Sequence, residues 1–177
     1  MNIETLKFPI GKYSKPATIT PALLTEWIAT LAALPSSLSN EVTNLTNEQL
    51  DTHYRPDGWT IRQVVHHLAD SHMNAFIRFK LALTEETPTV KPYLEASWAE
   101  LPDSSMPIES SLQIITGIHA RWVNLLRTFS DEDLSRTFIH PEHGKIFRLD
   151  EIIGLYAWHS NHHLAHITTL KERNGWK

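Results

Sequence analysis

The segment from about Leu149 to Arg173 contains no proline and ends near Gly175, which predicts one long helix. Its middle is unusually rich in histidine, at positions 159, 162, 163 and 166. Residues four positions apart share one face of a helix, with Cβ atoms about 5–6 Å apart. The pair His159/His163, or the pair His162/His166, can therefore aim two imidazole nitrogens at one divalent ion, at about 2.0–2.1 Å each. Two ligands hold an ion weakly, so we expect a third from another part of the chain.

The composition is that of an ordinary globular protein, and it argues against nucleic acid and membranes as partners. The 177 residues are 41% apolar and 20% charged, and they predict a single domain over residues 1–177. A net charge of -4 argues against nucleic acid as a partner. We expect a cytoplasmic protein, because the sequence has no membrane-length apolar segment and begins without the apolar core of a signal peptide. The expected partner is a small-molecule substrate. With no cysteine, the chain offers neither a thiolate ligand nor a cysteine nucleophile.

Helix signals divide the rest of the chain into an all-α four-helix bundle. Thr20-Pro21 predicts the start of the first helix, which Pro35 is expected to kink or interrupt. Thr60 with Gln63 matches a capping box, which predicts a second helix from Ile61 to about Leu83. A third is expected from about 108 to 129 and a fourth from near 150.

The remaining segments connect these helices. Residues 1–19 are expected to form an extended arm on the surface, and residues 84–107 a long crossover connection. Short capped turns are predicted at 46–50 and 130–134. Residues 137–148 suit a small hairpin or an irregular loop.

A short internal sequence repeat suggests where the third ligand lies. His66-His67-Leu68-Ala69 recurs as residues 162–165. If the two halves are related by a rough twofold, the second and fourth helices lie side by side. His67 would then complete a three-nitrogen site with His159 and His163, with one position left for water or substrate. Spacing alone does not choose between His66 and His67.

The other histidines favour a plainer interpretation. His53, His140 and His143 are expected to be solvated or hydrogen-bonded. His72 and His119 lie on the apolar faces of the second and third helices, where they are interpreted as satisfied core residues.

The segments Trp59–Asp70 and Leu155–Ile167 resemble the DinB/YfiT-like superfamily, and the resemblance extends over nearly the whole chain. It implies a four-helix bundle that holds a divalent metal through three histidines. In this sequence those would be His67, His159 and His163, whereas His162 and His166 would not bind the metal. The similarity is greatest to the YfiT branch, which implies a metal-dependent hydrolase that forms homodimers.

Three neutral nitrogen ligands suit zinc, nickel, copper or ferrous iron. We expect one divalent ion per chain, zinc first and nickel as the alternative. An open position would allow the ion to activate water for hydrolysis. The resemblance also implies an alternative reaction, that of a thiol S-transferase. Because the chain lacks cysteine, the thiol would have to be a co-substrate such as bacillithiol. A further alternative is a metal-binding stress protein without catalysis.

The sequence assigns no catalytic residue. A zinc protease is disfavoured because Ser160, and not glutamate, follows His159. Asp70 is the nearest acid to His67, but helical spacing turns it away from that residue's stripe. Weaker hypotheses place His162, His166, Tyr54 and Arg55 at the substrate, and Trp27, Trp98 and Trp176 at a dimer interface.

Overall fold

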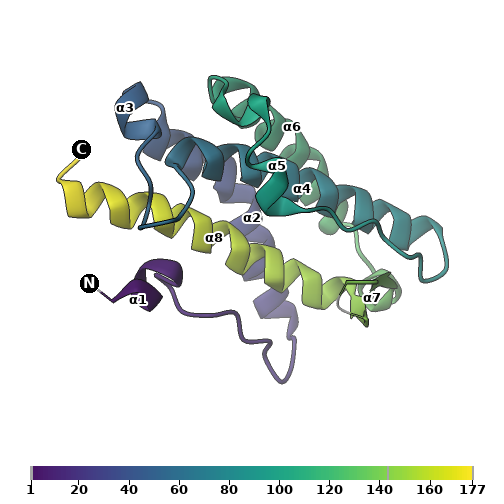
Figure 1. Cartoon of the computed structure of the whole chain (residues 1–177). Coiled ribbons are helices and arrows are strands. Elements are labelled where there is room, and N and C mark those ends of the chain that lie inside the picture. Colours follow the sequence, from purple (N-terminus) through teal and green to yellow (C-terminus); the bar gives the residue numbers. More distant parts are fainter. Residues whose placement is uncertain (1, 143, 177) are drawn as a thin grey trace.

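Four long helices pack into a bundle in the computed structural model, which describes residues 2–142 and 144–176 (Figure 1). They are α2 (Pro21–Val42), α4 (Ile61–Thr84), α6 (Glu109–Leu126) and α8 (Leu149–Asn174). Helix α2 packs against α6 and α8, and α4 packs against the same two helices. The prediction of an all-α four-helix bundle is confirmed.

The helices begin and end where local capping chemistry allows. The Thr60 hydroxyl oxygen accepts a hydrogen bond from the Gln63 backbone N–H, and the Gln63 side-chain oxygen accepts one from the Thr60 backbone N–H. The predicted capping box therefore forms at the start of α4. The same reciprocal bonds begin two short helices, α3 (Asn47–Leu50) and α7 (Asp131–Ser135). At the other end of the chain, Gly175 adopts a left-handed conformation with φ 63° and terminates α8.

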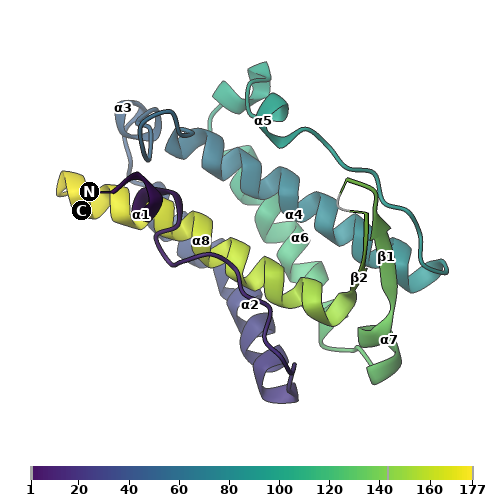
Figure 2. The same cartoon turned by 60° about the horizontal axis from the view of Figure 1, so that its bottom comes forward.

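Two predictions about the first part of the chain need correction. Pro35 does not interrupt the first helix, since α2 continues through it to Val42. The N-terminal arm is not wholly extended, because Asn2 caps a short helix, α1 (Ile3–Lys7). The arm does pack on the bundle: the ring of Phe8 lies 5.9 Å from that of His162 on α8. Figures 1 and 2 both place α1 beside the C-terminal half of α8.

The connections contain more regular structure than the sequence indicated. The crossover between α4 and α6 includes α5 (Glu95–Trp98) and a 3-10 turn at Pro102–Ser105. The expected hairpin forms as β1 (Thr137–His140) and β2 (Lys145–Arg148), which pair antiparallel before α8 (Figure 2). His143 lies outside the described residues.

The core holds α2 and α8 especially close together. An ideal Cβ built at Gly154 of α8 would lie 2.6 Å from the indole of Trp27 on α2. Only glycine therefore lets the indole pack on the helix backbone at this point. Trp27, which the sequence analysis suggested for a dimer interface, packs within the chain against Gly154 of α8. Within the part of the chain that the structure describes, no helix combines the length and apolar character needed to span a bilayer.

Candidate metal centre

Helices α4 and α8 bring His67, His159 and His163 together; these residues are called the three-histidine cluster. His159 and His163 are one turn apart on α8, with ring centroids 4.5 Å apart. The ring of His67 lies 5.4 Å from that of His159 and 4.8 Å from that of His163. One candidate ligand nitrogen from each ring lies within 4.8 Å of the others. The structure thus gathers the histidines that the sequence and the family resemblance singled out.

The spacing of two ring nitrogens fits a common ion. Nε2 of His67 and Nε2 of His159 lie 3.3 Å apart. Two nitrogens that bind one tetrahedral ion at about 2.0–2.1 Å each lie about 3.3–3.4 Å apart. His67 and His163 are buried, whereas His159 is partly exposed. The nitrogens of His67 and His159 are therefore already spaced as two ligands of one ion, and His159 is the most exposed of the three rings.

Burial keeps these imidazoles uncharged. Desolvation, reinforced by the charge of His162, lowers the pKa of His67 to about 4. Desolvation and the neighbouring histidines lower the pKa of His159 and of His163 well below the ordinary value. Metal ligation requires neutral imidazole, so the three rings are ready to bind near neutral pH. A neutral donor set would also leave the full charge of a divalent ion uncompensated.

Aromatic rings flank the cluster. Trp59 lies with its ring centroid 4.6 Å from that of His67 and 6.4 Å from that of His163. Tyr156, one turn before His159, lies 5.6 Å from its ring. Sequence reasoning assigned neither residue to the site. The signal for Trp59 was its place immediately before the cap of the helix that carries His67.

The geometry separates His66 from His67. Nδ1 of His66 lies 2.7 Å from the Ser111 hydroxyl, and its Nε2 lies 3.1 Å from the Met106 carbonyl. Both nitrogens of His66 are thus engaged with α6 and the crossover. Of the two neighbouring histidines that spacing left open, His67 is the one that lies in the cluster.

The second pair on α8 serves other contacts. His162 stacks on Trp158, with centroids 4.5 Å apart. His166 stacks on Tyr54 at 3.9 Å, and its Nε2 lies 3.1 Å from the Lys7 carbonyl. Neither belongs to the three-histidine cluster. These contacts hold the N-terminal arm and the turn before α4 against α8.

Asp70 is partly exposed, and desolvation, with a smaller contribution from the charge of Asp103, raises the pKa of its carboxyl to about 6. A carboxyl with this pKa could act as a general base. Asp70, however, is not part of the three-histidine cluster. A general base therefore stays unassigned.

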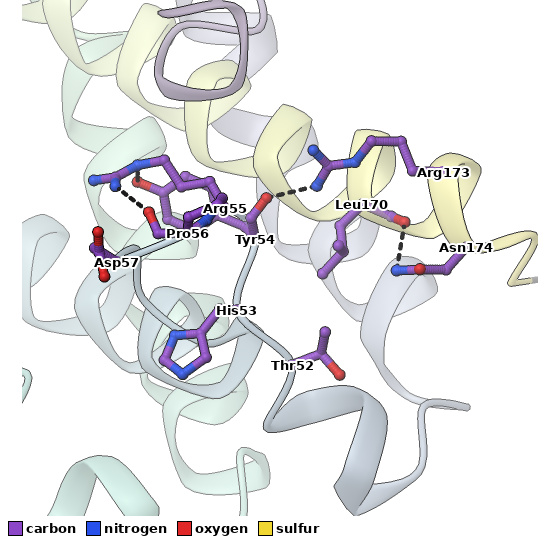
Figure 3. A pocket seen from close by; sticks show the side chains of 9 residues that line it. All are labelled: Thr52, His53, Tyr54, Arg55, Pro56, Asp57, Leu170, Arg173 and Asn174. Carbon is purple, nitrogen blue, oxygen red and sulfur yellow. Dashed lines mark hydrogen bonds between the residues drawn. The ribbon is translucent and has the colours of Figure 1, made fainter. Parts of the chain in front are cut away.

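An open pocket of about 740 Å³ lies between the segment 52–57 and the C-terminal end of α8, about two turns beyond His163 (Figure 3). Tyr54 and Arg55 line it together with Arg173, which donates a hydrogen bond to the Tyr54 carbonyl. None of the cluster histidines lines this pocket. The stack of Tyr54 on His166 connects the pocket wall to the helix that carries the cluster. Tyr54 and Arg55 therefore remain hypotheses for substrate contact.

Behind the cluster, hydrogen bonds continue into the core. Nδ1 of His159 lies 3.2 Å from Nε2 of His72, and Nδ1 of His72 lies 2.8 Å from Nε2 of His119. Nδ1 of His119 lies 2.7 Å from the Leu31 carbonyl oxygen. The prediction that His72 and His119 are satisfied core residues is confirmed. Their connection to His159 could not be read from the sequence, where the only signal was histidine on two apolar helix faces.

A family model described as the DinB superfamily matches residues 26–167. A relative from Bacillus mycoides, named "Putative metal-dependent hydrolase", is 52% identical over 174 residues, which cover 98% of this chain and 100% of the relative. A relative from Oceanobacillus iheyensis with the same description is 56% identical over 170 residues, which cover 96% of this chain and 98% of the relative.

Solved structures show the same likeness. YfiT from Bacillus subtilis, described as "a probable metal-dependent hydrolase with an unusual four-helix bundle topology", superposes with a TM-score of 0.95 at 49% identity. The match covers 98% of this chain and 99% of YfiT. A mycothiol-dependent maleylpyruvate isomerase matches with a TM-score of 0.60 at 18% identity, over 78% of this chain and 60% of the isomerase. That second likeness shows a shared fold alone.

Proposed function

This chain belongs to the DinB superfamily, and we propose that it is a metal-dependent hydrolase whose ion is held by His67, His159 and His163. The observation that carries the proposal is the convergence of three neutral imidazoles from two helices, two of whose Nε2 atoms lie 3.3 Å apart. The names of the relatives at 52% and 56% identity support the reaction class.

The donor set supports a reactive site more than a closed structural one. Within the described residues, the three-histidine cluster includes no carboxylate and no fourth histidine. A tetrahedral ion held by these three would keep one position for water or substrate. A divalent ion bound there would act as a Lewis acid and could bring the pKa of a coordinated water to about 7.

The chain's own residues supply binding, orientation and exclusion of solvent. The depressed pKa values of the cluster leave lone pairs on nitrogen for the ion. Trp59 and Tyr156 cover the flanks of the rings, which limits the entry of bulk water. We propose zinc as the ion, with nickel as the alternative, because nitrogen ligands suit both. A small molecule is the proposed substrate.

Metal content tests the ligand assignment with a matched pair of variants. His163→Ala removes a proposed ligand, and His162→Ala removes the preceding histidine, which has the same 7% exposure but lies outside the cluster. Elemental analysis of protein made without a histidine tag should find one ion per chain in wild type and in His162→Ala, and much less in His163→Ala. Equal metal content in both variants would refute the site.

Activity assays then separate the reactions. Metal-loaded protein is tested on a panel of esters and amides, and on electrophiles with and without an added low-molecular-weight thiol. Hydrolysis without thiol, lost in His163→Ala, supports the proposal. Turnover that requires the thiol would replace hydrolase with thiol S-transferase. Absence of turnover in all assays, despite stoichiometric metal, would favour the non-catalytic alternative.

A further inference from the structure

Pro35 leaves a buried carbonyl without its helical partner. In an α-helix the carbonyl of residue 31 accepts from the backbone N–H of residue 35, and proline has no such N–H. Pro35 lies inside α2, and Leu31 is fully buried. A buried carbonyl with no donor would cost about 1–3 kcal/mol. The Nδ1 of His119, at 2.7 Å, supplies the missing donor from α6.

This bond decides where His119 carries its proton. A backbone carbonyl can only accept, so Nδ1 of His119 must carry the hydrogen. Burial lowers the pKa of His119 to about 4, so the ring is neutral near pH 7 and its Nε2 has only a lone pair. That lone pair faces Nδ1 of His72 at 2.8 Å. Nδ1 of His72 must therefore be the donor.

The same logic passes through His72 to the metal centre. With its single proton on Nδ1, His72 presents a lone pair at Nε2, which lies 3.2 Å from Nδ1 of His159. His159 then donates from Nδ1 and keeps Nε2 unprotonated. That Nε2 is the atom 3.3 Å from Nε2 of His67. The opposite tautomer would place a hydrogen where a metal ion must bind.

We propose that Pro35, His119 and His72 are positioning residues for the metal centre, which act by fixing the tautomer and orientation of His159. The unit consists of the Leu31 carbonyl, His119, His72 and His159, and is called the histidine chain. It takes one group from each of the four long helices, so the packing of the whole bundle sets its geometry. The proposal rests on the proposed metal site and adds residues that do not touch the ion.

The surrounding core holds the rings of the histidine chain in one arrangement. The rings of His72 and His119 stack at 4.9 Å, and Trp122 packs edge-on to both, at 5.9 and 5.8 Å. Tyr156 packs perpendicular to His72 at 5.2 Å. His72 is fully buried and His119 is 1% exposed, so bulk water does not compete for their nitrogens. Hydrogen bonds of this kind to metal-ligating histidine contribute about 10–100-fold in metal affinity.

NMR of the metal-free protein reads the tautomers directly. Long-range proton–nitrogen spectra of protein labelled with ¹⁵N-histidine distinguish protonated from unprotonated ring nitrogens. We expect His119, His72 and His159 to carry hydrogen on Nδ1, with Nε2 of His159 unprotonated. A metal-free His159 that is protonated mainly on Nε2 would overturn the inference. This readout does not depend on an ion, so it is separate from the test of the proposed function.

Two substitutions of His72 separate hydrogen bonding from packing. Glutamine can accept from His159 and donate to His119, whereas phenylalanine fills the space and does neither. Metal affinity, measured by competition with a chelator, should fall about 10–100-fold in His72→Phe and recover most of that loss in His72→Gln. His66→Phe is the control, since His66 is similarly buried but bonds to Ser111 and Met106. Wild-type affinity in His72→Phe would overturn the proposal.

The role of Pro35 has its own test. Pro35→Ala restores a backbone N–H that competes with His119 for the Leu31 carbonyl. We expect a larger fraction of His159 protonated on Nε2 and weaker metal binding. Pro21→Ala, at the first turn of the same helix, is the control and should change neither quantity. An unchanged tautomer in Pro35→Ala would show that Pro35 does not act as a positioning residue for the histidine chain.

Discussion

The Nε2 atom of His67 on α4 lies 3.3 Å from the Nε2 atom of His159 on α8. An ion that binds both atoms joins the two helices directly. With no cysteine in the sequence, no disulfide can provide such a connection. Metal binding should therefore also be visible in the stability of the fold.

Addition of the native metal should raise the melting temperature. A ligand that binds only the folded state at about 100 times its Kd contributes about 2.7 kcal/mol. For a domain of this size that corresponds to about 5–10 °C. Calorimetry with metal and with chelator checks this in wild type, and His163→Ala should show no metal-dependent shift. A shift of equal size in that variant would contradict the ligand set.

Gly154→Ala should destabilise the protein, because the new Cβ would lie 2.6 Å from the Trp27 indole. Overpacking of this kind costs about 1–3 kcal/mol. Gly117→Ala on α6 is the matched control, since a Cβ there meets nothing within 4 Å. Because position 117 is exposed, this substitution should stabilise α6 by about 0.5–1 kcal/mol. Urea unfolding of the two variants checks the opposite signs, and equal effects would contradict the close packing of α2 on α8.

His119 should make the metal-free protein sensitive to acid. Its pKa is about 4 in the fold because of burial, against about 6.5 in the unfolded chain. Below about pH 6.5 the unfolded chain binds a proton that the folded protein refuses, so stability falls as pH falls toward 4, by an amount on the order of 3 kcal/mol. Unfolding free energies measured across this range should fall less steeply in His119→Gln. Identical slopes would show that His119 does not contribute.

Arg62→Lys should weaken the attachment of α3 and the crossover to α4. Nε and Nη2 of the buried Arg62 donate to Asp51 at 2.7 and 3.3 Å, and Nη2 and Nη1 also reach Asn47 and the Met106 carbonyl. A lysine ammonium cannot reproduce this fork. We expect a loss of about 1–3 kcal/mol in urea unfolding.

The exposed pair of Lys15 and Glu151 gives the comparison for Arg62, since Lys15 is 56% exposed. Lys15→Ala should cost less than about 1 kcal/mol. A loss in Arg62→Lys no greater than in Lys15→Ala would mean that the buried hydrogen bonds add nothing measurable.

The sequence by itself determined the features that depend on neighbours along the chain. The capping bonds of Thr60 with Gln63 form within one turn, so the start of α4 could be read directly. The one-turn spacing of His159 and His163 is equally local, and it placed two rings on one face of α8. The hairpin, which the sequence favoured no more than an irregular loop at 137–148, is also local, because its two strands lie close together in sequence.

Only the tertiary structure decided features whose partners are distant in sequence. Spacing left His66 and His67 open, and contacts with Ser111 and Met106 draw His66 away from the cluster. Pro35 is a helix breaker by local rules, yet α2 continues through it, and His119 supplies a hydrogen bond to the carbonyl that the proline leaves free. The periodicity of a helical sequence predicts the face on which a residue lies, but not the atom of another helix that it will contact. That contact depends on how the four helices pack.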